Sequence, residues 1–260
     1  MDWTSYDSAA ATHDRLRVPV IFAPPARDLA ARMEFASARS ALDVGTGSGV
    51  VAAAASACSF VAGVDPSVEM LRISRRNGQS RVAVAVVPGL PFGDATFDRV
   101  TAGFVLSHVP QYEAALADIV RVLRSGGMFG ATSWSQCRSE HHDVWDAVLE
   151  RFADPAVLKA AHDRALPWED RLSRAENVRG DLASAGLRDI QAEEIVYPIR
   201  MTIADFLEMR GTSFSARFFR ASAGDDALTR FQDAADEELR RRFSDPIDYT
   251  RGALIATARR

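Results

Sequence analysis

Short apolar runs alternate with helical patterns along most of the chain. Buried strands that alternate with helices are typical of a parallel sheet covered on both faces, so we expect an α/β fold with a doubly wound sheet. The apolar runs predict strands at 41–44, 60–64, 82–87, 98–105, 127–133, 191–199 and 252–258.

A helix is predicted over 112–124, before the fifth of these strands. Its apolar residues fall at i, i+3, i+4 and i+7, which places them on one helical face. They are Leu116, Ile119, Val120 and Leu123. Because glycine commonly ends a helix, we expect Gly126 and Gly127 to stop this one.

The first apolar run leads into a turn that carries three glycines. Gly45, Gly47 and Gly49 follow Leu42-Asp43-Val44 and precede an Ala-rich helical segment. Glycine has no side chain to hold a ligand away from the main chain, and it tolerates the positive φ of a sharp strand-to-helix turn. The turn is therefore a candidate for direct contact between backbone and ligand.

A carboxylate follows the second apolar run. Asp65 comes twenty residues after Gly45, where a carboxylate of a Rossmann-like βαβ unit can accept hydrogen bonds from two ribose hydroxyls. A dinucleotide fingerprint reads G-x-G-x-x-G, but here Gly49 comes one residue early and Val50 stands where the third glycine would be. This spacing disfavours a nicotinamide-dependent oxidoreductase.

Four motifs in order resemble the class I S-adenosylmethionine-dependent methyltransferases, of the small-molecule type found in ubiquinone and menaquinone biosynthesis. The first is the glycine turn, with Asp43 two residues before it. The others are the loop into strand four at 90–100, the segment after that strand at 104–109, and the helix, turn and strand at 121–129. Ser125 stands where the family usually has proline. The motifs cover roughly residues 40 to 134, about a third of the chain.

The resemblance implies one domain with a Rossmann-like seven-stranded sheet, its last strand antiparallel, and a helical cap. The implied parts are an N-terminal helical segment over the cofactor at 1–35, a cofactor-binding core at 36–134, cap insertions at 134–180 and 203–248, and closing strands at 184–202 and 249–260. The insertions are rich in aromatic residues: Trp134, Trp145, Phe152, Trp168, Phe206, Phe214, Phe218, Phe219, Phe231 and Phe243. Most such residues pack within a cap, but together they favour a largely apolar substrate.

S-adenosylmethionine is the implied cofactor, and its contacts follow from the motifs. The turn from Gly45 to Gly49 would meet the methionine end, with Asp43 fixing the turn or reaching the amino group through water. Asp65 would hold the ribose. Many relatives place an acid before the Leu-Pro-Phe loop, but Val86 stands there, so adenine would be recognised by packing and by nearby backbone groups. The full expected set is Tyr6, Asp43, Gly45, Thr46, Gly47, Gly49, Asp65, Pro66, Met70, Val86, Val87, Pro88, Gly103 and Phe104.

His108 is the candidate general base, because it follows the fourth strand at the cofactor edge and imidazole takes a proton near neutral pH. Its alternative role is to start a helix and bond the backbone. His13 shares the N-terminal segment with Tyr6 and is a second possible contact. Adjacent His141 and His142 seldom converge on one ion without further ligands, so we expect no metal.

Composition and charge exclude several classes of substrate and location. A net charge of -4 with interspersed signs gives no broad basic surface, so we expect no nucleic-acid substrate. We expect no signal peptide, membrane span or disulfide, with Cys58 and Cys137 free, in a cytoplasmic protein. Thirty of the thirty-one basic residues are arginine, Lys159 being the exception, which favours a high-GC bacterium and weakly hints at secondary metabolism.

The sequence thus predicts methyl transfer to a small hydrophobic or aromatic metabolite, with O-methylation ahead of N- or C-methylation. The alternative is a protein of the same fold that binds the cofactor without methyl transfer, as a cyclisation catalyst or an auxiliary binding module. We expect a monomer or a homodimer.

Overall fold

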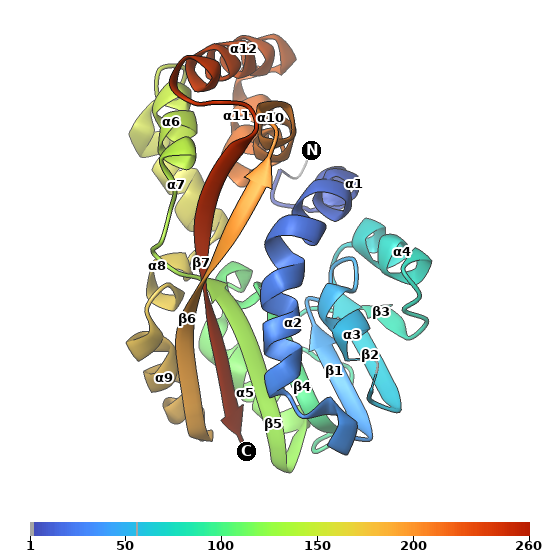
Figure 1. Ribbon diagram of the computed structural model, residues 1–260. Helices are drawn as coiled ribbons and strands as arrows, with labels where there is room; N and C mark the ends of the chain where they lie inside the picture. The colour runs from blue at the N-terminus through green and yellow to red at the C-terminus, as the bar shows by residue number, and fades with distance from the viewer. Residues whose placement is uncertain (1–2, 56) are drawn as a thin grey trace.

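The computed structural model describes residues 3–55 and 57–260. One seven-stranded sheet organises it, with strand order β3-β2-β1-β4-β5-β7-β6 (Figure 1). Neighbouring strands from β1 to β5 run parallel, whereas β7 is antiparallel to both β5 and β6. The predicted Rossmann-like sheet with an antiparallel last strand is confirmed. The strands are β1 (Ser40–Val44), β2 (Phe60–Asp65), β3 (Val82–Val84), β4 (Phe97–Gly103), β5 (Leu123–Trp134), β6 (Arg188–Met201) and β7 (Ile247–Arg259).

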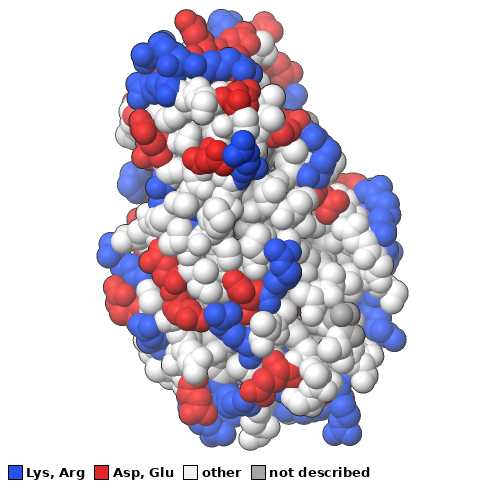
Figure 2. All heavy atoms as spheres, viewed as in Figure 1, with Lys and Arg blue, Asp and Glu red and all other residues white. Residues whose placement is uncertain are grey.

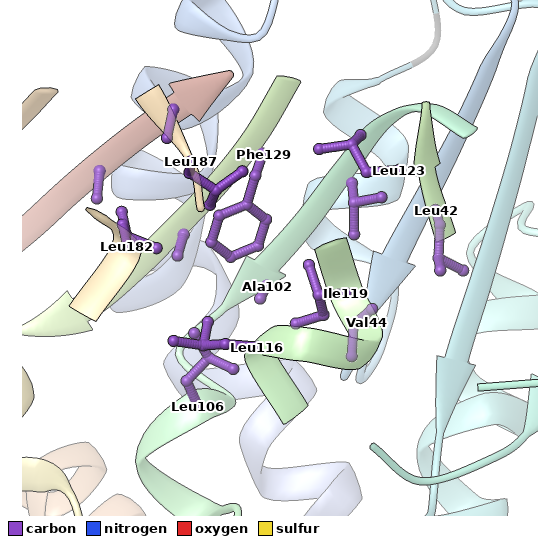
Figure 3. Packing of buried hydrophobic residues seen from close by; sticks show 14 of the residues in the cluster. Leu42, Val44, Ala102, Leu106, Leu116, Ile119, Leu123, Phe129, Leu182 and Leu187 are labelled. Atoms are coloured by element: carbon purple, nitrogen blue, oxygen red, sulfur yellow. The ribbon is translucent and has the colours of Figure 1, made fainter. Parts of the chain in front are cut away.

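Helices cover both faces of the sheet. On one face, α2 (Ala23–Arg32) and α3 (Val50–Ala54) share an apolar cluster with strand residues. On the other, α5 (Tyr112–Val122) and α9 (Ala175–Ser184) do the same. Figure 3 shows part of this second cluster, where Leu116 and Ile119 of α5 share the core with Phe129 of β5. Burying one such side chain stabilises the fold by roughly 1.5–3 kcal/mol.

The ends of several elements differ from the prediction. The helix at 112–124 ends at Val122, and Gly126 and Gly127 lie inside β5 rather than stopping the helix. Leu123 is extended and pairs with Phe97 of β4, so the last two residues of the predicted helix belong to β5. The strand predicted at 82–87 ends at Val84, because β3 is an edge strand with exposed side chains.

The N-terminal segment is helical over most of the described part of 1–35; Met1 and Asp2 lie outside the described residues. It consists of η1 (Asp7–Ala9), α1 (Ala10–Thr12), η2 (His13–Phe22) and α2, followed by η3 (Phe35–Ser37). η2 is a wide π-helical stretch that contains Pro19. Proline lacks an N–H for the helical ladder, and π-helical turns are frequent at functional sites.

β6 and β7 continue past the rest of the sheet as a two-stranded ribbon. Their pairing runs to Met201 and Ile247, whereas β5 stops pairing with β7 at Trp134 and Ala253. Helices gather around this ribbon (Figure 1). They are α6 (Glu140–Leu149), α7 (Pro155–Ala165), α10 (Ile203–Gly211), α11 (Phe214–Ala223) and α12 (Asp225–Arg242), while α8 (Glu169–Leu172) lies nearer the sheet. Two shorter elements complete the chain, α4 (Val68–Arg76) and η4 (Leu106–His108).

Charged side chains of both signs are interspersed on the face shown in Figure 2, with uncharged atoms across its middle. Within residues 3–55 and 57–260, no helix combines the length and apolarity that crossing a bilayer requires.

Candidate functional site

A cavity of about 770 Å³ opens at the carboxyl ends of β1, β2 and β4. Open α/β sheets place ligands at this edge. The helices η2, α6, α7, α10 and α11 and the start of the β6–β7 ribbon supply the other walls. Ten of the predicted site residues line this cavity: Tyr6, Gly45, Thr46, Gly47, Asp65, Pro66, Met70, Gly103, Phe104 and His108.

The glycine turn forms the floor of the cavity at the end of β1. Gly45, Gly47 and Gly49 all have positive φ, of 68°, 54° and 92°, a region that other residues enter only with strain. At Gly45 a Cβ atom would collide with the side chain of Val105. The turn therefore depends on glycine for its shape as well as for access to its backbone.

Asp65 ends β2 and faces the cavity. Its carboxylate accepts hydrogen bonds from the backbone N–H groups of Gly47, at 2.9 Å, and Ser67, at 2.8 Å. Burial raises the pKa of this carboxyl, and the two backbone bonds oppose that shift. Asp65 thus joins the end of β2 to the glycine turn while remaining on the cavity wall.

Asp43 lies beneath the turn and does not line the cavity. Its carboxylate accepts a hydrogen bond of 2.8 Å from the hydroxyl of Thr101 on β4. Burial raises its pKa to about 6. Of the two roles expected for Asp43, this position favours fixing the turn over reaching a ligand.

Four other expected contacts lie off the cavity wall: Gly49, Val86, Val87 and Pro88. Gly49 is the N-cap residue just before α3 and lies close to the side chains of Ser74 and Gln79. The side chain of Val86 is exposed beyond the end of β3. Pro66 and Met70 form the cavity wall next to Asp65 instead. The backbone N–H of Met70 donates a hydrogen bond to the hydroxyl of Ser67, the N-cap residue of α4.

The turn fits a nucleoside cofactor with an amino acid tail. Pro66 and Met70 give an apolar wall beside a carboxylate that can meet ribose hydroxyls. The hydroxyl of Ser48, also on the cavity wall, is buried and finds no hydrogen-bond partner within the described part of the chain. A buried polar group without a partner is costly, and a ligand at the turn can satisfy it.

An aromatic cluster on the cavity wall includes the candidate base, and its Tyr6 also packs against Met70. The ring of Tyr6 lies 5.7 Å from that of His108 and 5.9 Å from that of His13, and Phe214 contacts both Tyr6 and His108. Burial lowers the pKa of His108 to about 4 and that of His13 to about 3. Both imidazoles are therefore neutral at pH 7.

Phe104 is the strained residue of the site. It follows β4 with a φ of 55°, which is uncommon for a bulky residue and costs conformational energy. Its ring stacks on Trp134 at 4.1 Å and meets Phe22 edge-on at 5.1 Å. The three rings make an aromatic wall between the glycine turn and the helices of the ribbon.

Most aromatic residues of the two insertions serve packing. Of the ten named in the sequence, only Trp134 and Phe214 line the cavity. Trp145, Phe206 and Phe231 are fully buried in a separate apolar cluster with the ribbon. The high aromatic content of the insertions is therefore weaker evidence for an apolar substrate than the sequence analysis suggested.

Sequence reasoning missed the arginines of the cavity wall. Arg17 comes from η2, Arg210 from α10 and Arg251 from β7, while Arg138 precedes α6. No motif links these positions, and in an arginine-rich chain none of them stands out. Only the fold brings them to one wall.

His141 and His142 belong to the packing of α6. His142 bonds the Ser139 hydroxyl at 2.8 Å, and the ring of His141 packs on Phe243. Among the described residues, no three His, Cys, Asp or Glu side chains are grouped to hold a metal ion. Cys58 and Cys137 are free thiols.

Comparison with known families gives a match over residues 42–131, to the methyltransferase domain. The chain is 36% identical over 166 residues to the demethylmenaquinone methyltransferase of Bacillus licheniformis, covering 58% of this chain and 72% of that protein. It is 41% identical over 104 residues to the enzyme of that name from Staphylococcus aureus. That match covers 37% of this chain and 43% of the relative, so it spans less than half of the relative's length.

A solved structure resembles the whole chain. Phosphoethanolamine N-methyltransferase 2 of Haemonchus contortus, in complex with S-adenosyl-L-methionine, has a TM-score of 0.58 at 18% identity. The match covers 100% of this chain and 60% of that one. At this identity the likeness concerns the fold.

Proposed function

Since the chain belongs to the class I S-adenosylmethionine-dependent methyltransferases, we propose that it transfers a methyl group from S-adenosylmethionine to a small acceptor. One observation carries the proposal. The glycine turn and Asp65 open into the same cavity as His108 and the aromatic wall of Phe22, Phe104 and Trp134. A cofactor site and a space for a second molecule are thus continuous.

The residues of the turn would hold the cofactor. Asp65 would accept hydrogen bonds from the ribose, while Pro66 and Met70 flank the adenine. The backbone from Gly45 to Gly47 and the hydroxyl of Ser48 would face the methionine end. When bound, S-adenosylmethionine supplies a methyl group made electrophilic by its sulfonium. Asp43 acts from below by fixing the turn.

The acceptor would lie against the aromatic wall. Tyr6 and Phe214 face this space from one side and Phe22, Phe104 and Trp134 from another. Flat apolar rings bind by burial and by stacking, which supports a small acceptor with an aromatic or hydrophobic body. Two bacterial relatives are named demethylmenaquinone methyltransferase, so we include demethylmenaquinone among the acceptors to test.

Positioning would account for most of the rate. Alignment of two bound reactants can supply roughly 7–11 kcal/mol, whereas a general base contributes about 10²–10⁴-fold. The neutral imidazole of His108 can accept the proton that a hydroxyl acceptor loses. We therefore propose O-methylation ahead of N- or C-methylation, with His108 as the group that receives the hydroxyl proton.

We also propose that the helices at 134–180 and 203–248 act as a cap over this space, with the N-terminal segment closing the cofactor side. The protein would act in the cytoplasm of a bacterium, in secondary metabolism, as a monomer or homodimer and without nucleic acid. The interspersed surface charges support the last point (Figure 2).

The test is to incubate the protein with S-adenosylmethionine and a panel of phenols, quinols and amines, and to measure S-adenosylhomocysteine. Formation that depends on a hydroxyl acceptor supports the proposal. Cofactor binding without turnover of any acceptor would instead support a protein of this fold that binds the cofactor for another purpose. Saturation by NADH but not by S-adenosylhomocysteine would contradict both.

A further inference from the structure

Two arginines on the cavity wall carry no carboxylate partner. Arg17 and Arg251 form no ion pair within residues 3–55 and 57–260, although the structure contains many arginine–carboxylate pairs elsewhere. Both residues are half-buried on the cavity wall. Burial lowers the pKa of each to about 10, so both remain charged at pH 7.

Neutral groups hold Arg17 in place. One Nη donates a hydrogen bond of 2.8 Å to the carbonyl of Met209 and lies 3.4 Å from the hydroxyl of Thr212. Its Nε is buried without a partner in the described structure. These contacts fix the guanidinium against the end of α10 and leave its charge unbalanced.

Arg251 is held by two rings. Its guanidinium lies 3.9 Å from the centre of the Trp134 ring, and Nη1 lies 3.5 Å from Nε2 of His142. Burial lowers the pKa of His142, so this imidazole is neutral. Trp134 in turn stacks on Phe104 beside the glycine turn. Arg251 therefore stands at the edge of the space proposed for the acceptor.

The carboxylates of the inner cavity are already engaged. Asp146 accepts from Arg138 at 2.6 Å and from Arg210 at 2.9 Å. Glu169 lies 2.8 Å from the imidazole of His162. The other acids near the cap helices, Glu150, Asp163 and Asp170, are exposed, so water screens their charges.

The inner wall is therefore positively charged. Arg210 and Arg17 lower the pKa of Arg251, whereas Glu169, which is held by His162, acts in the opposite direction. Charges held partly out of water without a partner are costly. Guanidinium groups bind carboxylate and phosphate with directed pairs of hydrogen bonds, so an anion here would offset that cost.

We propose that the methyl acceptor carries an anionic group, a carboxylate or a phosphate, that Arg17 and Arg251 bind while its apolar body lies on the aromatic wall. This inference rests on the proposed function. The cofactor also has a carboxylate, but its tail belongs at the glycine turn. The two arginines are anchored instead on α10 and on the rings of Trp134 and His142.

Benzoate and benzamide provide a matched test, because they share a shape and differ in charge. We expect benzoate to bind the protein saturated with S-adenosylhomocysteine at least tenfold more tightly than benzamide, and inorganic phosphate to compete with it. Arg251→Gln and Arg17→Gln should each weaken benzoate at least tenfold and change benzamide less than threefold. Arg230→Gln, at an exposed position of α12, is the control and should change neither.

Equal affinity of the wild type for the two probes would overturn the proposal without any variant, as would failure to bind benzoate and phosphate at all. The proposal would also be overturned if both variants lost tenfold in S-adenosylhomocysteine affinity but kept their affinity for 5′-methylthioadenosine and their preference for benzoate. That result would assign the arginines to the carboxylate of the cofactor. If benzoate binds through Arg251 but S-adenosylhomocysteine does not bind, the proposed function fails and the anion site stands.

Discussion

The backbone N–H of Gly47 donates a 2.9 Å hydrogen bond to the carboxylate of Asp65. This bond joins the turn after β1 to the end of β2, at the edge where the cavity opens. The same carboxylate that would hold a ribose therefore also orders the turn. Changes on either side of this bond are expected to alter both the shape of the turn and its affinity for a ligand.

Gly45→Ala should disrupt the turn. The substitution forces alanine to a φ of 68° and drives its Cβ into Val105, so we expect a loss of about 2–4 kcal/mol in unfolding free energy, from backbone strain and overpacking together. Gly78→Ala is the control, with a φ of 96° and no atom within 4 Å of the added Cβ. Urea unfolding should show a smaller loss there, and equal losses would contradict the steric argument.

Asp43→Asn should remove a pH dependence of stability. Burial raises the pKa of Asp43 from 3.8 to about 6, so the folded protein holds this proton more tightly than the unfolded chain. The resulting stabilisation is complete below pH 3.8 and is lost as the pH rises through about 6, a change of about 3 kcal/mol. Unfolding measured from pH 4 to 7.5 should show that loss in the wild type only. A constant difference between the two proteins would refute the assignment.

His108→Gln should lower kcat by about 10²–10⁴-fold if the imidazole is the base, with little change in affinity for S-adenosylhomocysteine. Because burial lowers its pKa to about 4, the wild-type rate should not fall as the pH drops through 6.5. Stopped assays of methyl transfer at several pH values measure both effects. An unchanged kcat in the variant would leave His108 with a packing role.

Phe231→Ala and Trp134→Leu should separate packing from binding. Phe231 is fully buried among the helices of the ribbon, so its truncation should cost about 3–5 kcal/mol of stability and leave the affinity for benzoate unchanged. Trp134 lines the cavity and supports Arg251, so its loss should weaken benzoate binding. Thermal unfolding and ligand titration of both variants give the comparison. The opposite pattern would place the acceptor elsewhere.

The local sequence pattern was sufficient to predict β1, β2 and the glycine turn between them. The apolar runs of β1 and β2, the glycines between them and Asp65 lie within one short stretch, so their geometry follows from nearby residues. The end of α5 could not be predicted in the same way. There Leu123 pairs with Phe97 of β4, and a contact between strands decides where the helix stops.

The acceptor side of the cavity depends on contacts that are remote in sequence. Arg17 meets Met209, and Arg251 meets Trp134 and His142, only after the ribbon and the N-terminal helices have packed. The aromatic residues of the insertions were a poor guide to the substrate because their role also depends on tertiary packing. Sequence spacing did not distinguish Phe231, which packs inside a cluster, from Phe214, which faces the cavity.

Calorimetric titration with S-adenosylhomocysteine tests whether the cavity binds the cofactor. We predict that the wild type binds and that Asp65→Ala weakens binding at least tenfold, or about 1.4 kcal/mol. Asp94→Ala, at an exposed position paired with Arg121, should change the affinity less than twofold. NADH should not bind. Absence of binding by the wild type, or equal affinity of the Asp65→Ala protein, would contradict the assignment of this cavity to S-adenosylmethionine.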